Sequence, residues 1–273
     1  MTRTVPGSGA IIRPEFNSVF GVRAVFVENG GDGYDANDPY SSKEPVPQYA
    51  SLLNTDISKL KIGLIKQRMD PSWGESDVFD RFNVAVNDLR NLGAEVVEVS
   101  LPNIDYSAVA SATLINIDAS YLNRSLIETS LSGFDYNNQI RLLSGAMLPA
   151  VVHKKINAIR EIVRKEILDA LQEVDVLVLP TSPIIAPKIP VKKGMDNTQE
   201  MVDSFGGRRQ FTSPFNLANV PAMSVCCGFS DGGMPVGMQI VSKPFDEQTI
   251  FNVAYAYESA TDWHKMRPNL DSL

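Results

Sequence analysis

Residues 174–180 read VDVLVLP, and residues 149–172, which precede them by a single glutamate, read PAVVHKKINAIREIVRKEILDALQ. The first stretch is a short apolar run, typical of a buried strand, and it ends at Pro180, which has no N–H to donate to a neighbouring strand. In the second stretch apolar side chains recur every three or four residues, which predicts an amphipathic helix whose first turn accommodates Pro149. A long helix followed at once by a buried strand predicts an α/β protein.

Upstream, the same alternation of elements occurs on a smaller scale. Residues 61–65, KIGLI, predict a short buried strand, and residues 75–92 show helical spacing of apolar side chains. Gly93 is a plausible helix stop, and residues 94–99 alternate charge with valine, as in a strand. Strand, helix and strand at this spacing predict a βαβ unit with a right-handed crossover.

Further elements are expected on both sides of the long helix. Residues 107–130 are rich in alanine, leucine and isoleucine, which favours a helix. Two strands are predicted at 222–227 and 236–241, joined by a turn at Asp231-Gly232-Gly233, and a last helix at 246–260 with Asp246 as its N-cap.

The first 47 residues lack such patterns. Glycine, proline, asparagine and aspartate recur there, for example in GGDG at 30–33 and NDP at 37–39. These are turn and loop signals. We therefore expect a loop-rich segment at 1–47 and a folded domain at 48–273.

The composition excludes several classes of protein. The 273 residues carry 32 acidic and 25 basic side chains, a net charge of −7, which argues against a nucleic-acid surface. A locally basic helix is expected to be only a solvated face; its cations are Lys154, Lys155, Arg160, Arg164 and Lys165. No apolar run is long enough to span a membrane, and the first ten residues do not resemble a secretory signal, so a cytoplasmic protein is expected.

The residues usually used for catalysis are sparse. The sequence has no phosphate-binding glycine loop and no G-x-S-x-G turn around a nucleophilic serine. Its histidines are His153 and His264, and its cysteines are the adjacent Cys226 and Cys227, in no spacing that suits zinc. Surface or packing roles are favoured for the histidines, and buried positions in a strand for the cysteines. A serine or cysteine hydrolase that uses one of these histidines remains a minor alternative.

Three blocks near the C-terminus are more distinctive. They read DVLVLPTSPIIAP at 175–187, FTSPFNLANVPAMSVCCGF at 211–229 and GMPVGMQIV at 233–241, followed by PFDE at 244–247. In this order and spacing they resemble the C-terminal region of the amidase-signature family, over residues 60–270. Two upstream segments, MTRTV at 1–5 and YDANDP at 34–39, also resemble segments of that family.

The resemblance implies a mixed β-sheet core covered by helices, to which both halves of a longer chain contribute, so that the N-terminal half is expected to be missing here. It implies a hydrolase that cleaves a carboxamide C–N bond with a serine nucleophile, a second serine and a lysine base. The glycine- and serine-rich signature that carries these serines is not found in this sequence. No catalytic residue, cofactor or metal ligand is therefore assigned.

A substrate pocket is nevertheless expected, because loops at strand ends are where α/β sheets bind ligands. A stiff loop after the strand at 174–180, and an irregular segment held by Pro214, are expected to line it with Thr181, Ser182, Phe211, Thr212, Phe215 and Asn216. The alternative is that Pro214, Phe215 and Asn216 only fold a loop.

Several functions follow from the resemblance. The first is an amidase acting on a small amide substrate in its full-length form, with the 273-residue chain inactive alone. The alternatives are a non-catalytic binding protein, the complementing half of a split amidase, and the amidase subunit of a tRNA-dependent amidotransferase. A missing N-terminal half or a homo-oligomer is the expected partner. An uncovered sheet edge should make the isolated chain prone to association.

Overall fold

A computed structural model describes residues 3–4, 11–17, 21–29, 44–188 and 209–267, with side chains described from residue 44 onward. The chain divides into two compact units, Met1–Leu52 and Leu53–Leu273. The boundary lies five residues beyond the expected limit of the N-terminal segment.

The first unit contains regular structure that the sequence pattern does not indicate. Strands β1 (Arg3–Thr4), β2 (Ile11–Asn17) and β3 (Gly21–Asn29) form an antiparallel sheet in that order, and a 3₁₀ turn, η1, covers Tyr49–Leu52. The segment expected to be loop-rich thus contains two strands of seven and nine residues, Ile11–Asn17 and Gly21–Asn29. The YDANDP segment at 34–39 lies outside the described residues.

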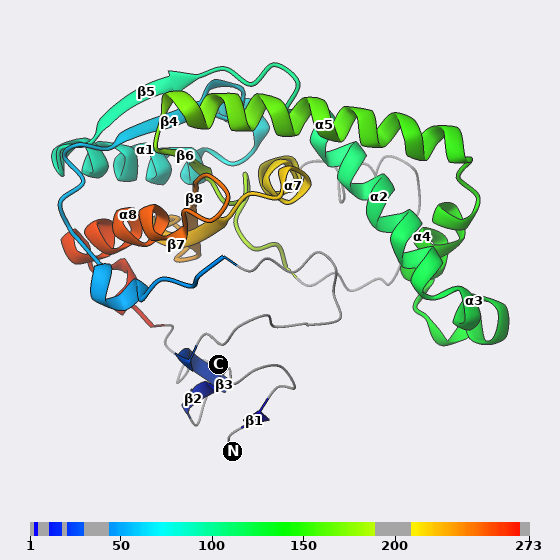
Figure 1. Ribbon diagram of the computed structural model, residues 1–273. Helices are drawn as coiled ribbons and strands as arrows, with labels where there is room; N and C mark the ends of the chain where they lie inside the picture. Colours follow the sequence, from blue (N-terminus) through cyan, green and yellow to red (C-terminus); the bar gives the residue numbers. More distant parts are fainter. Residues whose placement is uncertain (1–2, 5–10, 18–20, 30–43, 189–208, 268–273) are drawn as a thin grey trace. The chain divides into compact units, whose positions relative to one another are not determined.

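The second unit is built on a mixed five-stranded sheet in the order β5-β4-β6-β8-β7 (Figure 1). Strand β4 pairs in parallel with both β5 and β6, whereas β8 pairs antiparallel with both β6 and β7. The strands are β4 (Lys61–Ile65), β5 (Glu95–Val99), β6 (Val176–Pro180), β7 (Ala222–Phe229) and β8 (Pro235–Val241). The predicted α/β class and mixed sheet are confirmed.

The predicted βαβ unit is present. Helix α1 (Ser76–Asn91) connects β4 to the parallel strand β5, and its buried side chains recur at helical spacing. Gly93 has a φ of 99°, and its N–H donates to the Arg90 carbonyl while the N–H of Ala94 donates to the Leu89 carbonyl. This pair of bonds is a Schellman motif, which needs a left-handed residue and explains the glycine.

Helices cover both faces of the sheet, so the molecule has two cores. Helices α1 and α8 (Glu247–Ala260) pack on one face, around Phe82, Met238 and Tyr257. Helix α5 (Ala150–Glu173) and the shorter α7 (Arg209–Ala218) pack on the other face, around Leu177 and Phe211. Strand β6 alternates between the two cores, which accounts for its continuous apolar sequence.

The remaining elements are helical. Helix α2 (Tyr106–Leu122) packs against α5, and α4 (Tyr136–Ala146) and α3 (Arg124–Ser130) contact α2 in turn (Figure 1). Gly145 permits the close approach of α4 to α2, because a Cβ there would lie 2.0 Å from the Asn116 carbonyl oxygen. The short 3₁₀ turns of this unit are η2 (Lys66–Arg68), η3 (Pro71–Trp73), η4 (Leu131–Gly133) and η6 (Trp263–Lys265).

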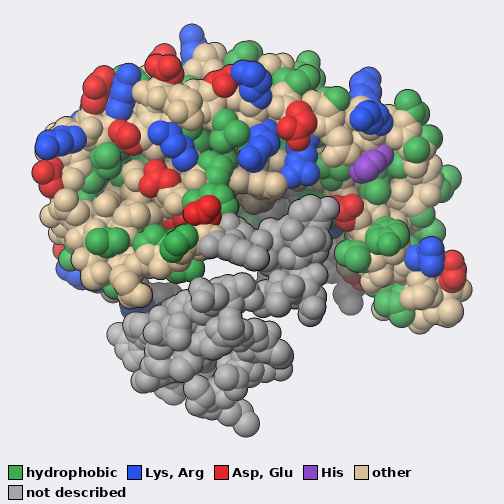
Figure 2. Space-filling view, viewed as in Figure 1, with side chains coloured by type: hydrophobic (Ala, Val, Ile, Leu, Met, Phe, Trp, Pro, Cys, Tyr) green, Lys and Arg blue, Asp and Glu red, His purple; other side chains and the backbone are tan. Residues whose placement is uncertain are grey.

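The described surface shows neither a membrane span nor a basic patch on the face in view. No helix in the described part of the chain has both the length and the apolar character to cross a bilayer. Figure 2 shows Lys and Arg side chains interspersed with Asp and Glu over the face that α5 crosses. Mixed charge of this kind does not favour a polyanion.

Candidate functional site

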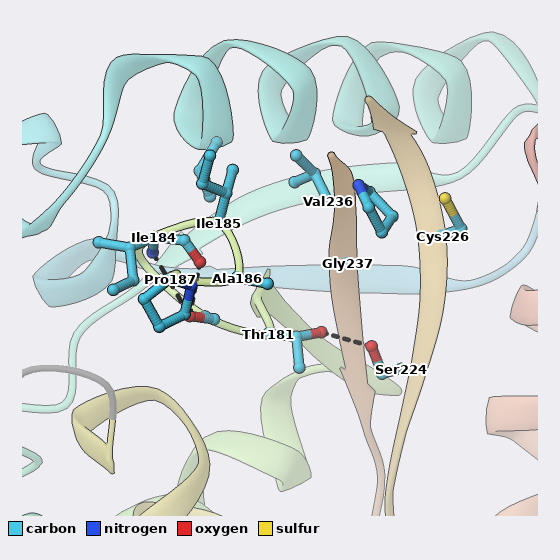
Figure 3. A pocket seen from close by; sticks show the side chains of 12 residues that line it. Thr181, Ile184, Ile185, Ala186, Pro187, Ser224, Cys226, Val236 and Gly237 are labelled. Atoms are coloured by element: carbon cyan, nitrogen blue, oxygen red, sulfur yellow. Dashed lines mark hydrogen bonds between the residues drawn. The ribbon is translucent and has the colours of Figure 1, made fainter. Parts of the chain in front are cut away.

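A cavity of about 460 Å³ lies where the loop after β6 meets the β7–β8 hairpin (Figure 3). Its volume is within the range of small-molecule sites. In the part of the chain that the structure describes, the residues that line it are all uncharged: Val78, Thr181, Ser182, Ile184, Ile185, Ala186, Pro187, Ser224, Cys226, Pro235, Val236 and Gly237. The cavity is thus an apolar pocket with two hydroxyls from the loop, one hydroxyl from β7 and one thiol.

Two of the hydroxyls form a pair. The Oγ1 of Thr181 lies 2.6 Å from the Oγ of Ser224, and either can be the donor (Figure 3). The backbone N–H of Thr181 donates to the Gly237 carbonyl at 2.8 Å, which holds the start of the loop against β8. Gly237 has to be a glycine for the pair to form, because a Cβ there would lie 2.8 Å from both hydroxyl oxygens.

The loop itself is braced by α1. The carbonyl of Pro183 accepts a 3.0 Å hydrogen bond from the N–H of Glu75, the N-cap residue of α1. The Ser182 hydroxyl donates to the Ile184 carbonyl at 2.8 Å, which closes a tight local turn. Gly74 lets the two segments touch, because a Cβ there would lie 1.9 Å from the Pro183 oxygen. The wall of the cavity is therefore fixed by backbone contacts.

The two cysteines face opposite sides of β7. Cys226 is half-buried and lines the cavity, whereas Cys227 is buried in the core beneath α1 and α8. Burial raises the pKa of the Cys227 thiol to about 12, so this thiol is protonated and unreactive near neutral pH. Alternation along β7 thus presents Ser224 and Cys226 together on the cavity side.

The other predicted pocket residues lie elsewhere. The segment expected to be irregular forms helix α7 (Arg209–Ala218), which contains Pro214. Phe211 and Phe215 are buried in the core under α5, and neither lines the cavity. Thr212 and Asn216 lie on the less buried side of α7. Of the six predicted residues, the cavity brings together Thr181 and Ser182.

Helix α7 tolerates its internal proline because other groups replace the lost hydrogen bond. In a regular helix the N–H of residue 214 would donate to the Gln210 carbonyl, and Pro214 has no N–H. The Nε of Arg68 donates to that carbonyl instead, at 3.1 Å. The next carbonyl, that of Phe211, accepts a buried 2.8 Å hydrogen bond from the side-chain amide of Gln239.

The end of α7 is a second Schellman motif. Asn219 has a φ of 51°, and its N–H donates to the Asn216 carbonyl. The N–H of Val220 donates to the Phe215 carbonyl at 3.2 Å. Asparagine is, after glycine, the residue that best accepts this left-handed position. The NLAN sequence at 216–219 thus stops a helix where a loop was expected.

Two arginines of the long helix satisfy the last carbonyls of α7. The Nε of Arg160 donates to the Leu217 carbonyl at 3.0 Å, and Arg164 donates to the Ala218 carbonyl. Cations favour the negative end of a helix. The expectation that the basic positions of this helix are only solvated is wrong for these two arginines, which join α5 to α7.

Arg68 is the buried charge of the second unit that sequence reasoning missed. Its side chain is 0% exposed, and its NH1 lies 2.7 Å from the Asp105 carboxylate. The guanidinium stacks 4.6 Å from the centre of the Trp73 ring and also contacts Phe211. Burial lowers the pKa of Arg68 and Asp105 raises it, but an arginine stays charged at any physiological pH. Local sequence gave no signal for it, since two groups that accept its charged hydrogen bonds, Asp105 and Gln210, lie 37 and 142 residues away in the chain.

The histidines and possible metal ligands do not form a site. His153 is exposed on α5 and contacts the side chain of Asn157, and His264 lies in η6. Within the described ranges, no hydrogen bond joins either histidine to Cys226 or Cys227. Those ranges also contain no group of three or more His, Cys, Asp or Glu side chains that could hold a metal ion.

Sequence comparison connects the chain to amide-processing proteins. The A subunit of glutamyl-tRNA(Gln) amidotransferase from Gloeothece citriformis is 35% identical over 264 residues, which is 87% of this chain and 53% of that protein. Its counterpart of the same name from Geobacillus thermodenitrificans is 35% identical over 262 residues, 87% of this chain and 52% of that protein. The chain therefore spans about half the length of the curated relatives it matches.

Structure comparison agrees. The crystal structure of the glutamyl-tRNA(Gln) amidotransferase A subunit from Thermotoga maritima matches with a TM-score of 0.67 and 26% identity, over 86% of this chain and 50% of that one. A bacterial aryl acylamidase of the amidase-signature family, at 20% identity, shares the fold with a TM-score of 0.70, over 87% of this chain and 52% of that one. The family model described as Amidase matches residues 26–251. Because this match covers most of the 273 residues, the chain belongs to the amidase family.

Proposed function

We propose that this chain forms part of an amide-hydrolysing enzyme and supplies one wall of its substrate site. The observation that carries the proposal is the family match over residues 26–251 in a chain that spans about half the length of its relatives. In this proposal, the residues that line the cavity beside Thr181 and Ser224 form that wall of the substrate site. The attacking serine and its base come from polypeptide sequence other than these 273 residues.

The chemistry of the described site supports an inactive chain. Hydrolysis through an acyl-serine needs a base beside the nucleophile and N–H donors at the developing oxyanion. Thr181 and Ser224 contact each other, and among the described residues no lysine or histidine lines their cavity. The sequence also lacks a Gly-Gly-Ser-Ser-Gly-Gly run. The hydroxyls present are therefore suited to binding a substrate but not to attacking it.

A second candidate is the role that the relatives' name describes. Proteins 35% identical to this chain are named as the A subunit of glutamyl-tRNA(Gln) amidotransferase, so a component that releases ammonia from an amide for a partner is a reasonable alternative. In both candidates the bond broken is a carboxamide C–N bond. They differ in the substrate and in the need for partner proteins. A cytoplasmic location, proposed for either, is consistent with the two free cysteines.

Ammonia release tests the proposal directly. The purified chain is incubated with benzamide, hexanamide and glutamine, and ammonia is measured with a coupled dehydrogenase assay. The chain is then co-expressed with the polypeptide encoded immediately upstream of Met1, and the assay is repeated. We expect no turnover by the chain alone and turnover by the pair. Turnover by the isolated chain would overturn the proposed division of the site, and an inactive, non-associating pair would overturn the amidase role.

A further inference from the structure

We propose that the cavity between the loop after β6 and the β7–β8 hairpin is a subsite for an uncharged carboxamide with an apolar acyl group, bound through the Thr181–Ser224 hydroxyl pair. The inference rests on the proposed function and deepens it, because it names the substrate class. It also separates the two candidate functions, since free glutamine carries a carboxylate and an ammonium group.

The hydroxyl pair has the hydrogen-bonding capacity of a carboxamide receptor. Each hydroxyl offers one hydrogen and two lone pairs. Their mutual 2.6 Å bond uses one hydrogen and one lone pair, and neither hydroxyl has another hydrogen-bond partner among the described residues. One hydrogen and three lone pairs are left. A carboxamide presents a carbonyl that accepts the remaining hydrogen and N–H groups that donate to the lone pairs.

The rest of the cavity disfavours charge. Its walls are the apolar side chains of Val78, Ile184, Ile185 and Val236, and none of the twelve lining residues is charged. Moving a carboxylate or an ammonium group into such surroundings without a partner is unfavourable, whereas a neutral amide only needs its hydrogen bonds satisfied. The Glu75 carboxylate, which accepts a 3.5 Å hydrogen bond from the N–H of Ile185, repels a carboxylate but attracts a cation, so a cationic ligand is the stricter test of a preference for neutral ligands.

Cys226 provides a reporter inside the cavity. It lines the same space, and the neighbouring Cys227 is buried and protonated at neutral pH. Iodoacetamide should therefore label Cys226 alone. In that reaction the thiolate sulfur displaces iodide from the methylene carbon, an S–C bond forms, and the thiol proton passes to the buffer. A ligand in the cavity blocks the sulfur and slows labelling.

Three ligands of nearly the same shape separate the effect of ligand charge from the effect of ligand shape. The full chain is labelled in the presence of benzamide, benzoate or benzamidine, which are neutral, anionic and cationic, and intact mass is followed with time. At about 10 mM, benzamide is expected to slow labelling at least about threefold, as for a Kd of a few millimolar, and the two ions should have little effect. A Cys226→Ser variant should take up no label, and a Cys227→Ser variant should behave as the parent.

Variants assign the effect to the hydroxyl pair. Thr181→Val and Ser224→Ala should abolish protection by benzamide, while Thr129→Val, which changes a threonine on the exposed side of α3, should leave it unchanged. Circular dichroism confirms that each variant is folded. Equal protection by all three ligands, strongest protection by benzamidine, or no protection at all would each overturn the proposal. These results are independent of turnover by the co-expressed pair, so a failed subsite is distinguishable from a failed amidase role.

Discussion

At the scale of single residues, Gly237 determines the form of the cavity. Its missing side chain leaves the space in which the hydroxyls of Thr181 and Ser224 meet. The position therefore needs glycine for a close contact and not for an unusual backbone conformation. A substitution at Gly237 should therefore change the shape of the cavity while the chain still folds.

Gly237→Ala tests this. The added methyl must push the two oxygens apart, because it would lie 2.8 Å from each. We expect a loss of about 1–3 kcal/mol in the free energy of unfolding, as for other overpacked sites, together with faster alkylation of Cys226. Urea unfolding and mass spectrometry measure the two effects.

Gly232→Ala is the matched control. A Cβ at Gly232, in the turn between β7 and β8, would have only the Ser230 hydroxyl as a neighbour, at 3.8 Å. It should change stability by less than about 1 kcal/mol. If both variants lost the same stability, the close contact at Gly237 would not be the cause.

At the scale of elements, α7 is a helix held by remote side chains. Arg68 and Gln239 donate hydrogen bonds to the carbonyls that precede Pro214. Arg160 and Arg164 donate hydrogen bonds to the last carbonyls of α7. These donors come from η2, β8 and α5. The helix therefore joins three parts of the second unit, although it is only 10 residues long.

A double-mutant cycle measures the link between Arg68 and Pro214. Arg68→Met should lower the free energy of unfolding by about 3 kcal/mol, because it leaves buried acceptors without a donor. In a Pro214→Ala background the loss should be about 1 kcal/mol smaller, since residue 214 can then donate to the Gln210 carbonyl itself. Denaturant unfolding of the four proteins gives the coupling energy.

Arg160→Met is the matched control, because Arg160, like Arg68, donates a hydrogen bond to a carbonyl of α7. Its acceptor is the Leu217 carbonyl at the other end of α7, so its effect should add to that of Pro214→Ala within about 0.5 kcal/mol. Additive behaviour of Arg68→Met as well would contradict the idea that its guanidinium replaces the missing N–H.

Elements with strong local patterns were predictable from sequence, and α7 was not. Strand β4 has its predicted limits, and Gly93 follows α1 as expected. The sequence of α7 contains a proline, and the side chains that bond to the carbonyls of this helix lie 142, 28 and 57 residues from them in the chain, at Arg68, Gln239 and Arg160. The cavity shows the same limit of local sequence. Thr181 and Ser182 were expected there because they follow a predicted strand, whereas Ser224, Cys226 and Gly237 were not expected because only the pairing of strands in the sheet brings them to the cavity.

At the scale of the whole molecule, apolar side chains are exposed at the end of α2 and directly after α4. Tyr121 and Leu122 of α2 are 75% and 76% exposed, and Met147, after α4, is 81% exposed. Helix α2 has no polar face that would explain this exposure. Large exposed apolar areas usually mark surfaces that another polypeptide covers.

Dye binding checks whether this surface is sticky in solution. The folded chain should raise the fluorescence of anilinonaphthalene sulfonate at least about twofold over a soluble control protein and should elute partly as oligomers. Leu122→Gln combined with Met147→Gln should reduce both effects. Val84→Gln, an equally apolar change on the exposed side of α1, should not. A monomer that binds no dye would contradict the prediction of an uncovered surface.

The order of the strands also sets the order of events during folding. Strand β6, at the centre of the sheet, joins β4, which is made more than 100 residues earlier, to β8, which is made more than 50 residues later. Contacts between such distant segments form slowly, because closing the long loop between them costs conformational entropy before the contacts can stabilise the chain. On the ribosome, β4, α1 and β5 must wait with the β4 edge of their sheet open until β6 has emerged, and β6 then exposes its own edge until β8 has emerged. Chaperone dependence of this chain should therefore be decided by the interval between the synthesis of residues 99 and 241.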